Sequence, residues 1–191
     1  MKTRLLLMAL AIASLIAPAC QSNNGWTAEE RKALREMIKS YRNYEYINSL
    51  SDNEYIVFSD NVGVALEEAY PVYTTFIAIP NVNGTVEEWV ITEVASQIQA
   101  DPTNLRHLFP YNELTTQKIL PAGLDRDSRK AFYSCLASKT NANFPSLNAF
   151  LMGIIINDSA TNAKVKRFES ECAAELFEWV VSEDVEVITE I

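Results

Sequence analysis

The sequence predicts an all-α protein with a single domain of about five to seven helices. Hydrophobic residues recur at spacings of three and four along several segments, which is the pattern of helices that bury one face. Residues that typically begin or end helices flank these segments. Some stretches are rich in β-branched and aromatic residues and leave room for a minor β element, so an α+β fold is the alternative.

The first helix is predicted to begin at Thr27. Residues 27–30 read Thr-Ala-Glu-Glu, a capping box in which the Thr hydroxyl and a Glu carboxylate bind free backbone N–H groups of the first turn. Hydrophobic residues then follow at helical spacing and form one stripe, namely Leu34, Met37, Ile38 and Tyr41.

Residues 54–79 fit both a helix and strands. The runs EYIVF and VYTTFIAI are rich in β-branched and aromatic residues, whereas VGVALEEAY between them is typical of a helix. Tyr70, Tyr73 and Phe76 recur at every third residue, which favours a helix kinked at Pro71. We expect a helix here, with strands as the alternative.

The middle of the chain is predicted to hold one longer helix and several short turns. An Asn-Gly pair at 83–84 is typical of a turn, and residues 85–100 then read as an amphipathic helix that the Asp-Pro pair at 101–102 ends. Its inner side is predicted to carry Val86, Trp89, Val90, Val94 and Ile98. Short helical turns are expected in residues 102–121.

The C-terminal third begins with a helix that Asp125 or Asp127 is predicted to cap. One face of this helix is expected to carry Ala131, Phe132, Cys135 and Leu136. Residues 144–156 are almost wholly apolar, which predicts a central buried helix or a core strand.

A further helix is predicted to open near Ser159, which would be its N-cap. Its apolar positions recur at spacings of three and four and comprise Val165, Phe168, Cys172, Leu176 and Trp179. Residues 185–189 are expected to pair as a short strand or to trail after the domain.

Cys135 and Cys172 are predicted to form a disulfide. Both lie on the apolar faces of their predicted helices, so they can meet across the buried segment 144–156. A bond between residues 37 positions apart stabilises the fold by about 3.8 kcal/mol in the chain-entropy treatment, before native strain and residual unfolded structure reduce this value. Two unpaired thiols buried in the core are the alternative.

The first 19 residues have the layout of a signal peptide. Lys2 and Arg4 flank the start, and the run LLLMALAIASLI that follows is too short to span a bilayer. Removal of 19 of the 191 residues leaves 172, enough for one ordinary domain. We expect a signal peptide over residues 1–19, a lipidated flexible tether over 20–26, a helical domain over 27–184 and an acidic tail over 185–191.

The end of this leader resembles the lipobox of bacterial lipoproteins. The junction reads Ala17-Pro18-Ala19-Cys20, and the resemblance, which covers the leader only, implies cleavage before Cys20 and attachment of a lipid to its thiol. Ala17 stands where Leu is commonest, and Pro18 is atypical of the motif. The same residues fit an ordinary A-x-A cleavage site, so secretion without a lipid is the alternative.

Cysteine parity favours the lipid anchor. The chain has three cysteines, and lipidation of Cys20 leaves an even number for an oxidising compartment. The resemblance implies a protein held on a membrane through its N-terminal lipid and located in the cell envelope. The outer membrane or the periplasmic face is favoured because Gln21, rather than Asp, follows the cysteine.

The acidic composition disfavours nucleic acid as a partner. The chain has a net charge of −9, and loss of two positive charges, Lys2 and Arg4, with the leader makes it −11. Residues 169–191 hold eight carboxylates and no base. They predict a solvated helix face followed by an acidic tail, or a docking surface for a basic partner, and another envelope protein is the expected partner.

Few residues indicate catalysis or a cofactor. His107 is the one histidine, so a site with several histidine ligands is excluded. A hydrolase built around His107 needs a carboxylate and a hydroxyl or thiol from elsewhere in the chain. Only five glycines are present, and no glycine-rich phosphate-binding motif occurs. We therefore predict no catalytic residue, no metal and no cofactor, with a hydrolase as the least favoured function.

Aromatic residues are concentrated between residues 41 and 76. Tyr44, Tyr46, Tyr55 and Tyr73 are candidates for an aromatic groove that binds a sugar or an apolar ligand, although their helical spacing also fits core packing. The preferred function is a protein-interaction or structural module of the envelope. A lipoprotein that binds a small ligand or a glycan is the alternative.

Overall fold

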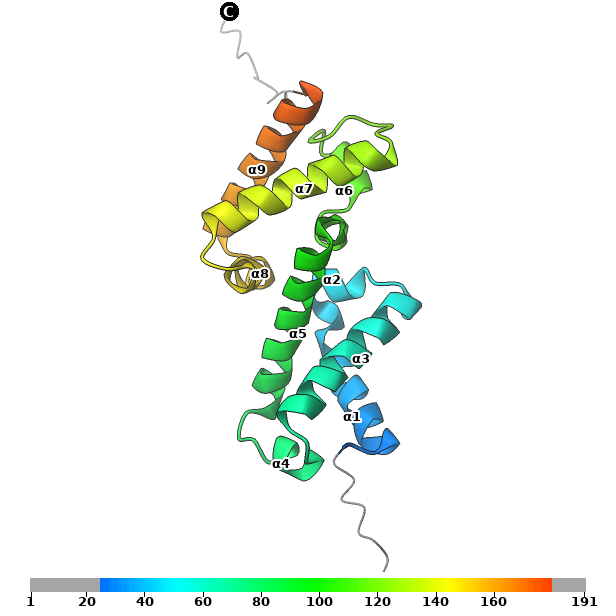
Figure 1. Cartoon of the computed structure of the whole chain (residues 1–191). Coiled ribbons are helices and arrows are strands. Elements are labelled where there is room, and N and C mark those ends of the chain that lie inside the picture. Colours follow the sequence, from blue (N-terminus) through cyan, green and yellow to red (C-terminus); the bar gives the residue numbers. More distant parts are fainter. Residues whose placement is uncertain (1–24, 180–191) are drawn as a thin grey trace, which may run out of the picture.

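The computed structural model describes residues 25–179, and the regular elements in this range are all helical (Figure 1). The all-α prediction is confirmed, and the strand alternatives are wrong for the described residues. The elements are α1 Ala28–Lys39, η1 Ser40–Asn43, α2 Glu45–Asn48, α3 Asp52–Ala69, α4 Tyr73–Ile77, α5 Val82–Ala100, η2 Pro102–His107, α6 Tyr111–Thr116, α7 Arg126–Asn143, α8 Leu147–Ile155 and α9 Ser159–Phe177. The expected five to seven helices are too few because several connections form helices of four to six residues. Residues 185–189 lie outside the described range.

Capping boxes begin α1 and α3. In α1, the Thr27 hydroxyl accepts a hydrogen bond from the Glu30 amide, and the Glu30 carboxylate accepts one from the Thr27 amide, as predicted. In α3, Ser51 and Glu54 make the same reciprocal pair. The second box was not predicted, although its Ser-x-x-Glu spacing stands in the sequence.

The predicted kink at Pro71 is a complete break. The helix α3 ends at Ala69, Tyr70 has an extended φ of −131°, and a separate short helix begins at Tyr73. Proline has no amide proton to donate and disfavours helical geometry in the residue before it, so Tyr70 and Pro71 stop the helix. The aromatic spacing from Tyr70 to Phe76 therefore spans two helices.

The Asn83–Gly84 pair lies inside α5 rather than in a turn before it. The side chain of Asn81 caps this helix and accepts a 3.2 Å hydrogen bond from the Gly84 amide. A Cβ atom at Gly84 would lie 2.2 Å from the Asn81 side chain, so the glycine is needed for this close cap. The helix ends before Asp101 and Pro102, as predicted.

The three C-terminal helices differ in detail from their predictions. Asp125 caps α7, but Ala131 is exposed and Tyr133 is buried in its place. Ser146 caps α8, which is shorter than residues 144–156 and not wholly buried, since Met152 is 40% exposed. The N-cap of α9 is Asp158 rather than Ser159. Of the apolar positions predicted for α9, Val165, Phe168 and Cys172 are buried, while Leu176 and Trp179 are exposed.

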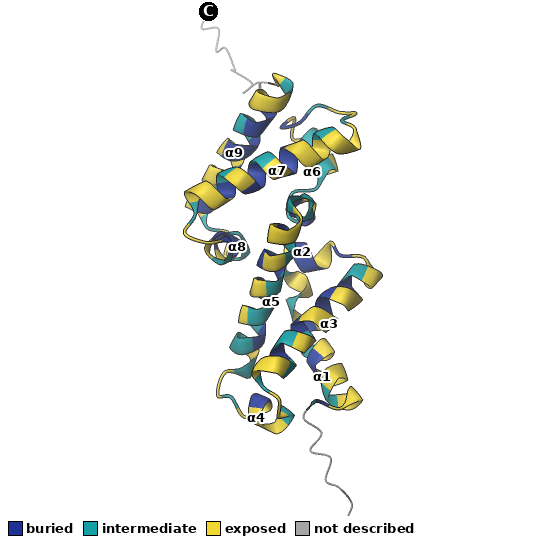
Figure 2. Ribbon diagram, viewed as in Figure 1, coloured by how far each residue is buried: buried dark blue, intermediate teal, exposed yellow. Residues whose placement is uncertain are grey.

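The helix α5 forms the long axis of the described domain. It packs against α1 and α3 along one part and against α8 and η2 along another. Figure 1 shows α1, α3 and α4 on the side of α5 that includes its N-terminal part, α2 beside its C-terminal half, and α6 to α9 around and beyond its C-terminal end. Figure 2 shows that buried residues line the inner sides of both groups, and these residues form one continuous core.

Cys135 and Cys172 form a disulfide between α7 and α9, with an S–S distance of 2.06 Å. The two helices pack directly against each other. The sequence predicted that the bond would reach across residues 144–156. It instead joins two helices that are in direct contact. It fixes α9 on α7, and α9 supplies one wall of the pocket described below.

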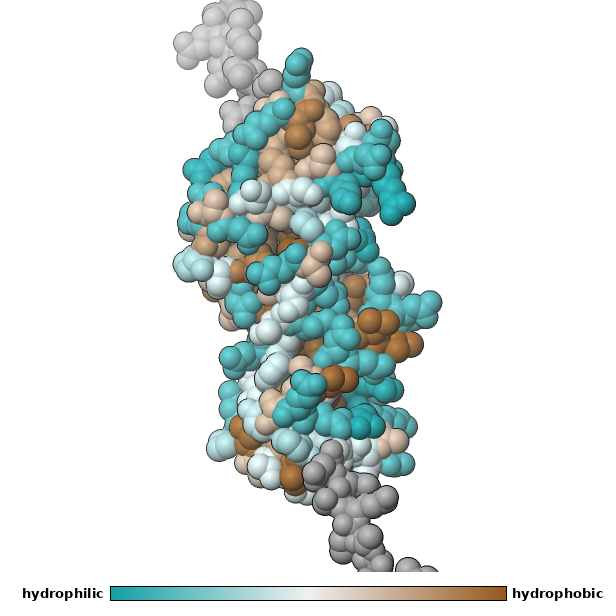
Figure 3. Space-filling view, viewed as in Figure 1, coloured by the Kyte–Doolittle hydropathy of each residue, from teal (hydrophilic) through white to brown (hydrophobic). Residues whose placement is uncertain are grey.

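The described surface is mixed in polarity. Apolar side chains lie exposed over α3, where Ile56, Val57 and Val64 are each more than half exposed (Figure 3). Among residues 25–179, no helix combines the length and the hydrophobicity that a membrane span requires.

Candidate binding pocket

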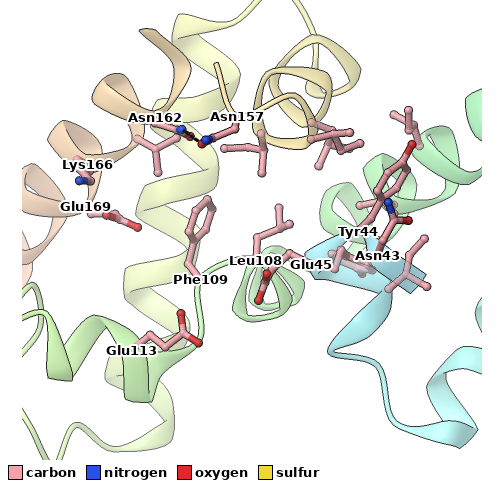
Figure 4. Close-up of a pocket in the computed structure, with 18 of the residues that line it drawn as sticks. Asn43, Tyr44, Glu45, Leu108, Phe109, Glu113, Asn157, Asn162, Lys166 and Glu169 are labelled. Carbon is pink, nitrogen blue, oxygen red and sulfur yellow. Dashed lines mark hydrogen bonds between the residues drawn. The ribbon is translucent and has the colours of Figure 1, made fainter. Parts of the chain in front are cut away.

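A half-open pocket of about 710 Å³ lies between α2, α5, α6, α8 and α9 (Figure 4). Its volume falls within the range of roughly 300–1,000 Å³ that is usual for small-molecule sites. Its wall is mixed. The hydrophobic part includes Val90, Val94, Leu108, Phe109, Ile154, Ile155 and Val165, and polar groups supply about half of the surface that the pocket exposes. The arrangement favours a ligand that has both an apolar and a polar part.

Two tyrosine hydroxyls fix the walls of this pocket. The Tyr133 hydroxyl on α7 donates a 2.8 Å hydrogen bond to the Phe109 carbonyl, which holds the chain from which the Phe109 ring extends into the pocket. The Tyr46 hydroxyl donates a 2.8 Å bond to Gln97 and fastens α2 to α5. Both tyrosines are buried. Their hydrogen bonds therefore position apolar walls that come from distant parts of the sequence.

Glu169 is the most unusual residue of the pocket. It lies on α9 one turn after Val165, on the face that packs into the domain, and only 4% of it is exposed. Its carboxyl makes no hydrogen bond and no ion pair with any residue in 25–179. Burial raises the pKa of this carboxyl to about 7, and the charge of Lys166 opposes the rise only in part. The predicted solvated acidic face is therefore wrong at Glu169.

The other charged groups leave the pocket negative. Glu45 and Glu113 line it together with Glu169, against a single lysine, Lys166. Figure 4 shows the carboxyls of Glu169 and Glu113 reaching toward the same space from α9 and α6. With both acids ionised, the field inside the pocket favours a cation over an anion.

The structure does not bring the four candidate tyrosines together. Tyr44 and Tyr46 line the pocket, with the Tyr44 hydroxyl bonded to Glu87. Tyr55 lies elsewhere, with its hydroxyl 3.3 Å from the Arg35 carbonyl, and Tyr73 packs edge-on against Trp26 at 4.9 Å between ring centroids. Phe109, which sequence reasoning did not identify, is the aromatic ring at the middle of the pocket.

His107 lies beside a hydroxyl and a carboxylate, as a hydrolase would require. Its Nδ1 is 2.9 Å from the Ser49 hydroxyl oxygen, and its Nε2 is 3.8 Å from Glu54. The second distance is too long for a hydrogen bond. Burial and the charge of Arg106 lower the pKa of His107, with Glu54 opposing them, so the imidazole is neutral at pH 7.

The direction of the Ser49 hydrogen bonds argues against catalysis at His107. The Ser49 hydroxyl donates its proton to the Tyr46 carbonyl at 2.8 Å. While the Tyr46 carbonyl accepts the Ser49 proton, the serine oxygen can only accept a proton from Nδ1, whereas a nucleophilic serine donates its proton to the histidine. This arrangement joins η2 to α2 and does not activate Ser49.

A second, more open cavity of about 820 Å³ lies beside His107. Four bases line it, namely Arg106, Arg126, Arg129 and Lys130. All four are exposed, and Arg106 is paired with Glu54 at 3.1 Å. Exposed, hydrated bases of this kind give little selectivity for a ligand.

Among residues 25–179, no group of three or more His, Cys, Asp or Glu side chains is arranged to hold a metal ion. No family model matches the chain, and no curated protein or solved structure is similar enough to match it. Function is therefore inferred from the pocket and from the sequence.

Proposed function

We propose that this protein is exported, anchored in the cell envelope by a lipid on Cys20, and binds a small ligand with an apolar part in the pocket between α5 and α9. The apolar wall around a cavity of about 710 Å³ carries the proposal for ligand binding. The signal-peptide layout and the lipobox-like junction support the anchor.

The apolar wall gives a physical reason for binding. Leu108, Phe109, Ile154 and Ile155 line the pocket and are only partly buried, although they pack against the core. Covering such surface is favourable by about 25 cal/mol for each Å² of apolar area removed from water. A ligand that fills the pocket removes this apolar area from water, and the buried core residues do not have to move.

A matched pair of tryptophan variants tests ligand binding. Ile155 lines the pocket, whereas its neighbour Ile156 is exposed outside it. Ile155→Trp should fill the cavity and weaken binding of the neutral dye N-phenyl-1-naphthylamine at least tenfold. Ile156→Trp should bind the dye as the wild type does. Equal dye binding by the two variants, or no binding by the wild type, would contradict the proposal.

Mass spectrometry of the intact mature protein tests the anchor. A chain that begins at Cys20 and carries a diacylglyceryl group is expected, with the lipid lost in Cys20→Ser. A mature chain with an unmodified Cys20 would leave the domain secreted rather than anchored.

A protein partner in the envelope is the second candidate function, and the apolar residues exposed on α3 favour it. A photoreactive residue at Val64 should give one defined cross-linked species in envelopes, and Val57→Lys should abolish it. Retention of the same species by Val57→Lys would show that this face is not responsible.

A further inference from the structure

We infer that Glu169 selects ligands in which a protonated amine is attached to an apolar body. The inference rests on the proposed ligand pocket and names the class of molecule that it takes. Its basis is a buried carboxyl that faces the pocket and has no partner among residues 25–179. Figure 4 shows this carboxyl directed from α9 toward the middle of the cavity.

An unpartnered carboxyl in an apolar wall is costly to the protein. An ionised carboxylate loses hydration when it is buried, and it regains this energy only from a countercharge or from hydrogen-bond donors. Lys166, one turn away on α9, is the nearest base of the pocket, yet it lies outside ion-pair distance and is exposed. The described chain therefore supplies no partner for Glu169, and an ammonium group supplies both the charge and the donors.

The groups around Glu169 disfavour the other ligand classes. Glu113 on α6 and Glu45 on α2 add negative charge to the pocket, and Lys166 on α9 adds one positive charge. Tyr133 on α7 lies near Glu169 but outside the pocket lining, and it is neutral. A fatty acid would place its carboxylate among these acids. A neutral apolar molecule would leave Glu169 desolvated and unpaired, so an amine is the best match.

Three probes of equal chain length separate these classes. Decylamine, 1-decanol and decanoate would each displace the bound dye at pH 8, below the concentrations at which they form micelles. The wild type should bind decylamine about tenfold more tightly than decanol, as expected for one charged hydrogen-bonded pair, and decanoate most weakly. Glu169→Gln should lose most of this preference for decylamine over decanol. Glu88→Gln removes the same charge from an exposed position on α5, outside the pocket lining, and should keep the preference.

The outcomes distinguish the two proposals. Equal binding of amine and alcohol by the wild type would overturn the selection by Glu169 and leave the apolar pocket standing. Binding of none of the three probes would overturn both. A second measurement on the wild type covers the case in which Glu169→Gln does not fold. Most of the amine preference should be lost at pH 5, where Glu169 is protonated, while decanol binding stays constant. An amine preference that is as large at pH 5 as at pH 8 would contradict the inference.

Discussion

The Ser49 hydroxyl oxygen lies 2.9 Å from Nδ1 of His107, and this contact joins the end of α2 to η2. Because α2 carries Tyr44 and Tyr46 to the pocket, the contact helps to hold one pocket wall in place. The one histidine of the chain thus stabilises a wall of the binding site without lining the pocket itself.

Removal of the Ser49 hydroxyl should weaken the fold modestly. Ser49→Ala is expected to lower the free energy of unfolding by about 1 kcal/mol, as is usual for one hydrogen bond, in a urea titration at pH 7. Ser49→Ala should also leave labelling by a fluorophosphonate probe unchanged. A probe adduct on Ser49 in the wild type would instead indicate a nucleophilic serine.

Glu169→Gln should stabilise the protein in a pH-dependent way. The pKa of Glu169 is about 7 in the folded protein and 4.5 in the unfolded chain. The folded state therefore holds the proton more tightly, and the stabilisation that this provides is complete below pH 4.5 and is lost as the pH rises through 7.

The glutamine variant lacks this loss, so its advantage over the wild type should grow by about 3 kcal/mol between pH 4.5 and pH 8. The comparison requires urea titrations of both proteins at several pH values. A constant difference across this range would show that Glu169 titrates at its ordinary pKa. A functional group that destabilises its own fold is typical of a binding site.

Gly153 should tolerate no side chain, because α8 and α9 approach each other closely there. A Cβ atom at this position would lie 2.3 Å from the Thr161 hydroxyl oxygen. Gly153→Ala should lower the free energy of unfolding by about 1–3 kcal/mol and weaken dye binding, since it separates two pocket walls.

Gly63 on α3 provides the control for Gly153. Its added Cβ would meet only Leu34 at an ordinary 3.6 Å. Gly63→Ala should therefore raise stability by up to about 1 kcal/mol through its better helix propensity. Equal effects of the two alanines would argue against the close approach of α8 and α9.

Loss of the disulfide should destabilise the domain without unfolding it. Cys135→Ser with Cys172→Ser is expected to lower the free energy of unfolding by about 2–4 kcal/mol. A reducing agent should lower the stability of the wild type by a similar amount and leave the double variant unchanged. Reaction of both thiols with a thiol reagent in the untreated, oxidised domain would show that no bond forms.

Local signals in the sequence predicted much of the fold. The Thr27 cap, the Asp-Pro end of α5 and the stripe that includes Val165 and Cys172 depend on neighbours within one or two turns, and all three appear in the structure. The error at Ser159 arose because Asp158 and Ser159 can each cap a helix. The error at Pro71 arose because a proline can either kink a helix or end it.

The site was harder to predict because its parts come from distant segments. Tyr44, Phe109 and Ile155 meet only after α2, α6 and α8 pack around α5. One local signal existed: Glu169 stands four residues after Val165 and three before Cys172, inside an apolar stripe. A carboxylate at a core position indicates either a buried pair or a ligand. The sequence does not distinguish these because an ion-pair partner is supplied only by tertiary packing.

Carbon-13 NMR of the Glu169 side-chain carboxyl, assigned by its loss in Glu169→Gln, tests the central claim most directly. The account predicts a pKa of about 7 in the free domain and a clear fall when decylamine is added, because a bound ammonium stabilises the carboxylate. A pKa near the ordinary value for glutamate that decylamine does not change would contradict the existence of an unpartnered, ligand-facing carboxyl in this pocket.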